Sequence, residues 1–203
     1  MRVPRCKFSR CWQVACVGIA GVLASCGPWF LWGGSKELRE RLTRMERSVR
    51  RLKEQAGPSD QRWLLEEAEA LLQQAQKALE AGQEYVSDQL CDAADDALDA
   101  IRHLRKARSI RGQPSRGDRD RRETARDLEQ AYFAIRQGEY FAERLKGNAQ
   151  RYVELARRLY QEARSAYDQG ELAQASELAE AIEEIIGVLD NLAQARSLEP
   201  PRL

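Results

Sequence analysis

Apolar residues recur at intervals of three and four positions along most of the chain beyond residue 35, which is the spacing of one face of an α-helix. The first such run predicts a basic amphipathic helix over residues 35–56, with Ser35 as a suitable N-cap. This coiled-coil-like seam lasts under three heptads. It fits either a self-associating stalk or, as we favour, a helix that packs on its own domain. Its apolar positions are Leu38, Leu42, Met45, Val49 and Leu52.

A first helical hairpin is predicted over residues 57–104. The residues Gly57-Pro58-Ser59-Asp60 break the preceding helix and begin the next one, and Gly82 separates the two arms of the hairpin. Because alanine has a small side chain, we expect the two backbones to approach each other closely. The seams are Leu64, Ala68, Leu71, Ala75 and Ala78 in the first arm, and Val86, Leu90, Ala94, Ala97, Ile101 and Leu104 in the second.

A second helical domain is predicted over residues 123–195, followed by a frayed tail at 196–203. Gly138 is predicted to turn the chain after a short helix. A long helix then runs toward Gly170, with Gly147-Asn148 as a candidate break, and the last helix follows Gly170. The seam of the short helix is Leu128, Ala131, Tyr132 and Ile135.

The two hairpins form an internal repeat. A shift of 88 residues aligns 64–104 with 152–192 without a gap, and ten of the 41 aligned pairs are identical. The identities include the glycine at each turn, Gly82 and Gly170. The sequence therefore predicts an all-α protein built from antiparallel helical hairpins.

The second copy of the repeat resembles a tetratricopeptide hairpin in its pattern of small residues. It departs from that family where Leu159 replaces the preferred Trp and Gly187 the preferred Pro. It is equally similar to the uncharacterised helical-hairpin domains of bacterial envelope lipoproteins. The resemblance implies a helical scaffold with a groove for a protein partner, whereas an alanine-rich bundle would give the same spacing without a solenoid. The matching residues are Leu159, Ala163, Ala166, Gly170, Ala175 and Ala179.

The N-terminal residues have the layout of a secretory signal peptide, in which a basic segment precedes an uncharged core and a few small residues. The residues Leu23-Ala24-Ser25-Cys26 resemble the lipobox of bacterial lipoproteins. The resemblance implies that residues 1–25 are removed and that Cys26 is acylated, for example with palmitate. Residues 26–34 would then be an aromatic segment beside the lipid, and the body would be anchored in the cell envelope.

A signal anchor that spans the membrane is the alternative. No charged residue occurs between Cys11 and Ser35, and a run of that length can cross a bilayer. Gly27-Pro28 interrupts the run, however, and the basic residues beyond it weaken the charge asymmetry that orients a span. We therefore favour the lipid anchor and keep a single-span, membrane-anchored coiled-coil protein as the more distant alternative.

Cysteine usage and charge distribution limit the chemistry further. Of the five cysteines, Cys91 alone would remain free in an acylated mature chain, so no internal disulfide is expected. The chain has a net charge of +1, but basic and acidic segments alternate along it. Residues 36–55 and 105–122 each carry eight basic side chains, against four and two acidic ones, whereas 60–104 and 123–203 are net acidic.

The segment 105–122 is predicted to be a basic, flexible linker, because it contains two glycines and a proline and almost no apolar residue that could anchor it. A charged, solvated loop is the interpretation that we favour. No aromatic residues are interleaved with the basic ones, and export would separate them from nucleic acid, so no nucleic-acid partner is expected. The alternative is binding of anionic envelope polymers or lipid headgroups by Arg111, Arg116, Arg119, Arg121 and Arg122.

No catalytic, cofactor or metal site is expected. His103 is the only histidine, so a nucleophile with an activating histidine cannot be assembled convincingly. A carboxylate-bridged metal site in a bundle would need Glu-x-x-His pairs on two helices. Cys91 is interpreted as a buried apolar filler. A stripe of carboxylates is interpreted as a solvated face: Asp88, Asp92, Asp95, Asp96 and Asp99.

These features together indicate a lipid-anchored, non-catalytic helical scaffold or adaptor of the bacterial cell envelope. Its expected partners are the membrane and a protein bound in a helical groove, with self-association as a further option. The alternative function is that of a structural envelope protein that binds anionic polymers or lipids through its basic segments.

The lipid anchor yields a direct prediction. Cys26→Ala removes the thiol that acylation requires, so the variant is expected to accumulate as an uncleaved precursor that takes up no fatty-acid label. Intact mass and metabolic labelling measure both properties. Normal processing and labelling of the variant would rule the anchor out.

Overall fold

The computed structural model describes residues 29–55, 57–113, 118–145 and 147–197. Six helices are the regular elements of this described part, which confirms the predicted all-α class. None of these helices combines the length and the apolar character of a membrane span. The predicted signal peptide, Cys26 and the end of the tail lie outside the described residues. The helices are α1 (Trp29–Lys53), α2 (Ser59–Glu80), α3 (Glu84–Ser109), α4 (Asp118–Leu145), α5 (Ala149–Asp168) and α6 (Leu172–Ser197).

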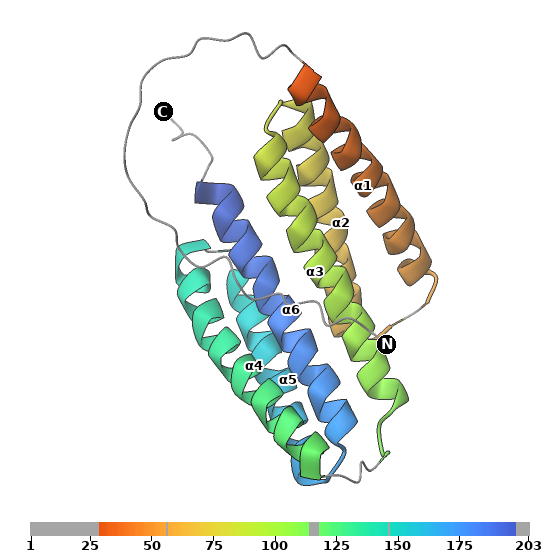
Figure 1. Cartoon of the computed structure of the whole chain (residues 1–203), viewed down its shortest axis with the longest axis vertical. Helices are drawn as coiled ribbons and strands as arrows, with labels where there is room; N and C mark the ends of the chain where they lie inside the picture. Colours follow the sequence, from red (N-terminus) through yellow and green to blue (C-terminus); the bar gives the residue numbers. More distant parts are fainter. Residues whose placement is uncertain (1–28, 56, 114–117, 146, 198–203) are drawn as a thin grey trace.

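The helices form two three-helix units, α1–α3 and α4–α6, that meet mainly through α3 and α6 (Figure 1). Residues later in α3 contact residues earlier in α6. Asp96 contacts Asn191, whereas His103, further along α3, contacts Glu177, nearer the start of α6. The two helices are therefore antiparallel. The outer helices α1 and α4 lie on opposite sides of the molecule (Figure 1).

The internal repeat corresponds to these two units. A shift of 88 residues carries α3 onto α6 from end to end. It also carries Trp63 of α2 onto Arg151 of α5, and these two equivalent residues touch, with the Arg151 guanidinium 4.4 Å from the centre of the Trp63 ring. Equivalent, antiparallel elements that contact each other are related by an approximate two-fold axis. A tetratricopeptide solenoid instead stacks each repeat on its sequence neighbour, so the fold is a bundle.

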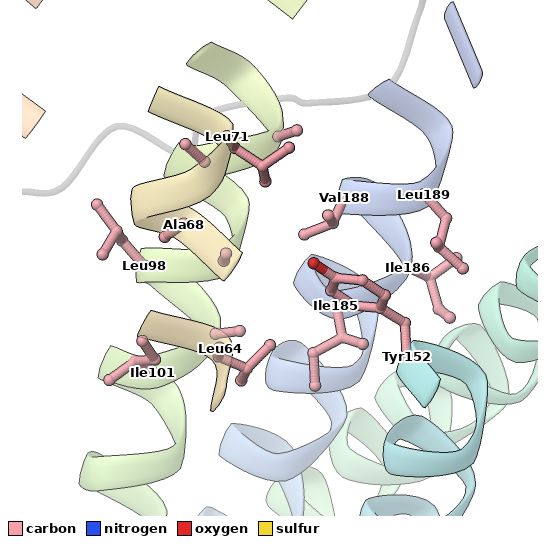
Figure 2. Packing of buried hydrophobic residues seen from close by; sticks show 14 of the residues in the cluster. Leu64, Ala68, Leu71, Leu98, Ile101, Tyr152, Ile185, Ile186, Val188 and Leu189 are labelled. Carbon is pink, nitrogen blue, oxygen red and sulfur yellow. The ribbon is translucent and has the colours of Figure 1, made fainter. Parts of the chain in front are cut away.

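The two units fill their cores with residues of different size at equivalent positions. Ala94, Ala97 and Ala100 of α3 are fully buried, and their repeat equivalents on α6 are the fully buried Ile182, Ile185 and Val188. Each of these branched side chains contributes about 1.5–3 kcal/mol when fully buried. Figure 2 shows part of this cluster, with Leu64 of α2 pointing toward Ile185 of α6.

Helix α1 is an integral part of its bundle. Its seam residues Leu38, Leu42, Met45 and Val49 are 4–7% exposed. This confirms packing on its own domain and not a self-associating stalk. The helix begins at Trp29, so Ser35 lies inside it, and the predicted N-cap at Ser35 is wrong.

The predicted turn at Gly138 is also wrong, because α4 continues through this glycine to Leu145. An added Cβ at Gly138 would lie 2.5 Å from Cδ1 of Ile186, so this glycine permits close approach of α4 to α6. The glycines that do end helices have left-handed backbone angles, as at Gly82 (φ 75°) and Gly170 (φ 80°).

The helices also extend into the predicted linker at 105–122. Helix α3 ends at Ser109 and α4 begins at Asp118, so the connection is shorter than expected. The backbone N–H of Gly112 donates a hydrogen bond to Glu171 at 3.1 Å, which ties the start of this connection to the turn before α6.

Packing of the repeat predicts the effect of a core substitution. Ala163 is fully buried on α5, so Ala163→Leu should overpack the second unit and lower the free energy of unfolding by roughly 1–3 kcal/mol. Ala125→Leu, at an exposed position of α4, is the matched control and should change it little. Equal thermal or denaturant stability of the two variants would contradict this packing.

Candidate functional site

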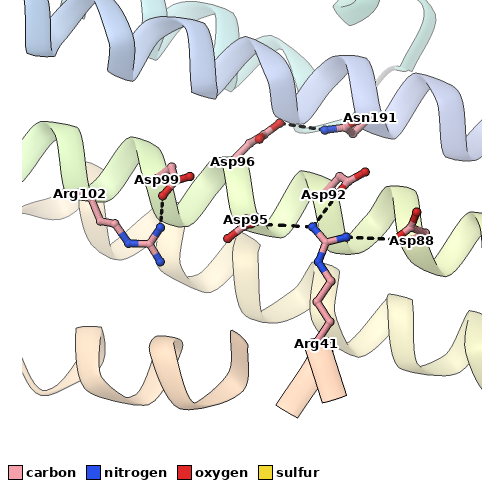
Figure 3. Close-up of polar contacts among 8 residues, drawn as sticks. All are labelled: Arg41, Asp88, Asp92, Asp95, Asp96, Asp99, Arg102 and Asn191. Atoms are coloured by element: carbon pink, nitrogen blue, oxygen red, sulfur yellow. Dashed lines mark hydrogen bonds and ion pairs between the residues drawn. The ribbon is translucent and has the colours of Figure 1, made fainter. Parts of the chain in front are cut away.

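A single arginine binds most of the acidic stripe on α3 (Figure 3). The Arg41 guanidinium reaches from α1 to carboxylate oxygens of Asp88 at 3.0 Å, Asp92 at 2.6 Å and Asp95 at 3.8 Å. Burial lowers the pKa of Arg41, but the hydrogen bond and charge of Asp92 outweigh it, so the pKa lies above its usual value. These three carboxylates stay partly exposed, as expected of a solvated face, and they also hold α1 to α3.

The rest of the stripe also has partners. Asp99 pairs with Arg102 on the same helix, and Asp96 accepts a hydrogen bond from Asn191 of α6 at 2.8 Å (Figure 3). A Cβ added at Gly187 would lie 2.5 Å from an Asp96 oxygen, so the carboxylate occupies the space that a side chain at residue 187 would need. The acidic stripe thus joins α3 to both α1 and α6.

Arg105, at the start of the predicted basic linker, has a structural role. Its guanidinium donates hydrogen bonds to the carbonyl oxygens of Leu52 at 3.2 Å and Gln55 at 3.0 Å. A cation at this position satisfies free carbonyl groups at the end of α1 and interacts favourably with the helix dipole. Together with Arg41, it fixes α1 at both ends of its contact with α3.

His103 lies in a charge network between α3 and α6. Its Nδ1 is 3.0 Å from Glu177 and its Nε2 is 3.5 Å from Glu180, while Lys106 pairs with the other oxygen of Glu177. Burial raises the pKa of Glu180, although the His103 charge opposes the shift. Both ring nitrogens of His103 therefore face carboxylates. Among the residues that the structure describes, no group of three or more histidine, cysteine or carboxylate side chains is arranged to hold a metal ion.

Cys91 is fully buried on α3. Burial raises the pKa of its thiol to about 11, despite the opposing charge of Arg41. The thiol is therefore protonated at neutral pH, and it is neither accessible nor nucleophilic.

The structure describes three of the five arginines that are predicted as an anionic-ligand site. Arg111 is exposed after α3, and Arg121 lies on α4 with its guanidinium 5.1 Å from the centre of the Tyr167 ring. Arg122 is exposed on α4. Arg116 lies outside the described residues, as does the side chain of Arg119. The anionic-ligand site therefore stays a prediction.

The two outer helices carry different exposed faces. On α1 the exposed side chains form what we call the basic ridge: Lys36, Arg39, Arg44, Arg47, Arg50 and Arg51. On α4, three large aromatic side chains form what we call the aromatic face: Tyr132, Phe133 and Tyr140, which are 48%, 61% and 51% exposed. Helices α1 and α4 are therefore equivalent in the repeat but differ in their exposed side chains.

A hollow of about 370 Å³ lies beside the aromatic face, between α4 and α6. Phe133 forms one wall, Ala134 and Ile186 supply apolar surface, and Asp190 adds a carboxylate. Tyr132 is exposed, so its predicted place in the buried seam is wrong. Helical periodicity gives no signal that separates its ring from the buried residues around it, because adjacent positions such as Leu71 and Leu72 are both buried in this fold.

Comparisons with protein-family models, with curated proteins and with solved structures found no match for this chain.

The contact of Arg41 with α3 predicts a specific loss of stability. Arg41→Gln should lower the free energy of unfolding by roughly 1–3 kcal/mol, because it removes charged hydrogen bonds and leaves three neighbouring carboxylates without their shared cation. Arg39→Gln, on the exposed side of the same helix, is the control for loss of one charge. Chemical denaturation measures both, and an equal effect of the two substitutions would show that Arg41 does not hold α1.

Proposed function

We propose that this protein is a lipid-anchored, non-catalytic helical adaptor of the bacterial cell envelope. The observation that carries the proposal is the exposed aromatic face on α4, which lies on the side of the molecule opposite α1, the helix nearest the candidate acylated cysteine (Figure 1). One side of the bundle is thus next to the membrane, and the other is available for a partner.

The lipobox-like sequence before Cys26 supports the membrane side of this proposal. Helix α1 begins at Trp29, only three positions after that cysteine, and its seam is buried against α2 and α3. An acylated Cys26 would therefore hold the bundle close to the bilayer and not at the end of a long tether. Two or more acyl chains give stable attachment.

The aromatic face supports the partner side. Exposed large apolar side chains beside a hollow are typical of protein–protein contact sites, where aromatic residues and arginine are enriched. The Arg144 guanidinium lies 4.6 Å from the centre of the Tyr140 ring, so both residue types are present on this surface. Ala134 and Ile186 in the adjacent hollow provide apolar surface for a partner side chain.

The surroundings of the reactive residue types agree with a non-catalytic role. The Cys91 thiol is sealed in the core, and each ring nitrogen of His103 faces a carboxylate. A nucleophilic mechanism requires an accessible nucleophile within reach of a base, and these two residues are not arranged in that way.

The second candidate function is a structural envelope protein that binds anionic polymers or lipids through basic segments. The basic ridge of α1 favours it, because these side chains are exposed on the outward side of the helix. The distant alternative, a membrane-anchored coiled-coil protein, lacks support because the α1 seam is already buried within the bundle.

The adaptor proposal predicts that the aromatic face determines which proteins the chain contacts. In-cell cross-linking of the full chain, followed by purification from envelope membranes, should give a defined protein adduct. Phe133→Ser should reduce that adduct at least about tenfold, since a central aromatic contact of an interface contributes 2 kcal/mol or more. Tyr85→Ser, which removes another exposed aromatic side chain from α3, should not.

Two outcomes would contradict the adaptor function. The same adduct from the native chain and from both variants would show that the aromatic face is not the contact surface. Recovery of polysaccharide or lipid without a protein adduct would support the second candidate.

A further inference from the structure

We propose that the basic ridge of α1 is a contact surface for anionic phospholipid headgroups, which lays the bundle along the bilayer on α1 and turns the aromatic face of α4 away from it. The orientation rests on the proposed function, because the lipid anchor brings α1 to the membrane. The surface itself is argued from its own geometry and charge.

The packing of α1 fixes the direction of the ridge. The seam residues Leu38, Met45 and Val49 point into the bundle. On an α-helix, positions three and four apart share a face, so Lys36, Glu40 and Arg47 lie on the side opposite this seam, and Arg39 lies at its flank. The ridge therefore cannot turn inward without undocking α1, which the Arg41 contact with α3 opposes.

The six cations of the ridge stand among three exposed glutamates, Glu37, Glu40 and Glu46, so the ridge keeps a net positive charge. Lys36, Arg39, Arg44 and Arg47 form no ion pair with another described residue. Arg41, on the inward side of the same helix, pairs with aspartates of α3. The same helix thus uses one cation for folding and leaves the outward cations for another partner.

The outer helix of the second unit uses its arginines differently. Arg136 of α4 pairs with Glu139 at 2.6 Å, and Arg157 of α5 pairs with the same carboxylate at 2.6 Å. Arg121 and Arg144 lie over aromatic rings. The two units share their helix order, but α1 packs mainly on α2, whereas α4 packs mainly on α6.

Phospholipid headgroups fit the ridge better than a protein surface does. A row of exposed side chains from Lys36 to Arg47, in which four cations outnumber three glutamates, extends for about 17 Å along the helix at 1.5 Å per residue and contains no aromatic anchor. Such a row can contact a plane of mobile phosphates without specific docking pockets. Basic side chains beside a membrane anchor each contribute about 1 kcal/mol on an anionic surface.

The test compares two variants that lose the same number of arginines, one on the basic ridge and one outside α1, so that the position of the charge is distinguished from the total charge. The chain from residue 26 onward, which is the proposed mature form, carries Cys26→Ala to remove the acyl attachment point and is partitioned onto vesicles of phosphatidylcholine with and without about one-third phosphatidylglycerol. The ridge variant is Arg39→Gln, Arg44→Gln and Arg47→Gln. The control variant loses three exposed arginines outside α1, through Arg108→Gln, Arg126→Gln and Arg164→Gln.

We expect the ratio of anionic to neutral partition coefficients to fall by about tenfold or more in the ridge variant at low salt, and little in the control. The advantage of anionic vesicles should shrink as salt rises. An equal fall in both variants, or no fall in the ridge variant, would overturn the proposal.

A second measurement does not depend on any variant of the ridge. Native full-length chain is reconstituted in the same two vesicle types, and its arginines are modified with a membrane-impermeant reagent and mapped by mass spectrometry. Arg39, Arg44 and Arg47 should be shielded only on anionic vesicles, while Arg126 and Arg164 react equally on both. Equal reactivity of the ridge on both vesicle types would contradict the proposal, whereas failure to remain on neutral vesicles would contradict the anchor alone.

Discussion

The antiparallel packing of α3 against α6 is the interaction on which the rest of the structure depends. The buried side chains of α3 and α6 belong to one hydrophobic cluster, so the two units share a core. This contact determines the approximate two-fold relation of the units. It therefore also determines that α1 and α4, which are equivalent in the repeat, lie on opposite sides of the molecule (Figure 1).

Polar contacts then specify how the outer helices attach. Arg41 binds the carboxylates of α3, and Arg105 satisfies carbonyl groups at the end of α1. Both contacts leave the exposed cations of α1 on its outer surface. In the account proposed here, the bundle is a spacer that keeps these two faces apart.

Much of the fold follows from local patterns in the sequence. Hydrophobic periodicity identifies the seam of α1 and the 88-residue repeat. The backbone preference of glycine identifies the turns at Gly82 and Gly170. Both signals come from residues that are close in the sequence. The turn predicted at Gly138 is wrong because the sequence does not distinguish a glycine that permits close approach of two helices from one that ends a helix. Only the position of Ile186 distinguishes them.

The same limit applies to the surface. Periodicity shows that the carboxylates of α3 share a face, but not that Arg41, some fifty residues earlier, reaches them. It likewise could not separate the exposed ring of Tyr132 from the buried residues around it. Sequence reasoning therefore identified the elements and most of the core, whereas the partners of charged side chains required the tertiary structure. The candidate lipidation site at Cys26 rests on the sequence alone.

The most direct measurement of the central claim is a disulfide between α3 and α6. A Cβ at Gly187 would lie 3.8 Å from the Cβ of Asp96, which is the usual separation in a disulfide. Mild oxidation of the Asp96→Cys, Gly187→Cys variant should therefore link the two helices within one chain, as read by non-reducing peptide mapping. Asp88→Cys with Gly187→Cys, displaced by two turns of α3, should remain unlinked. Efficient linkage of the displaced pair, with none in the first, would contradict the antiparallel packing that separates the two functional faces.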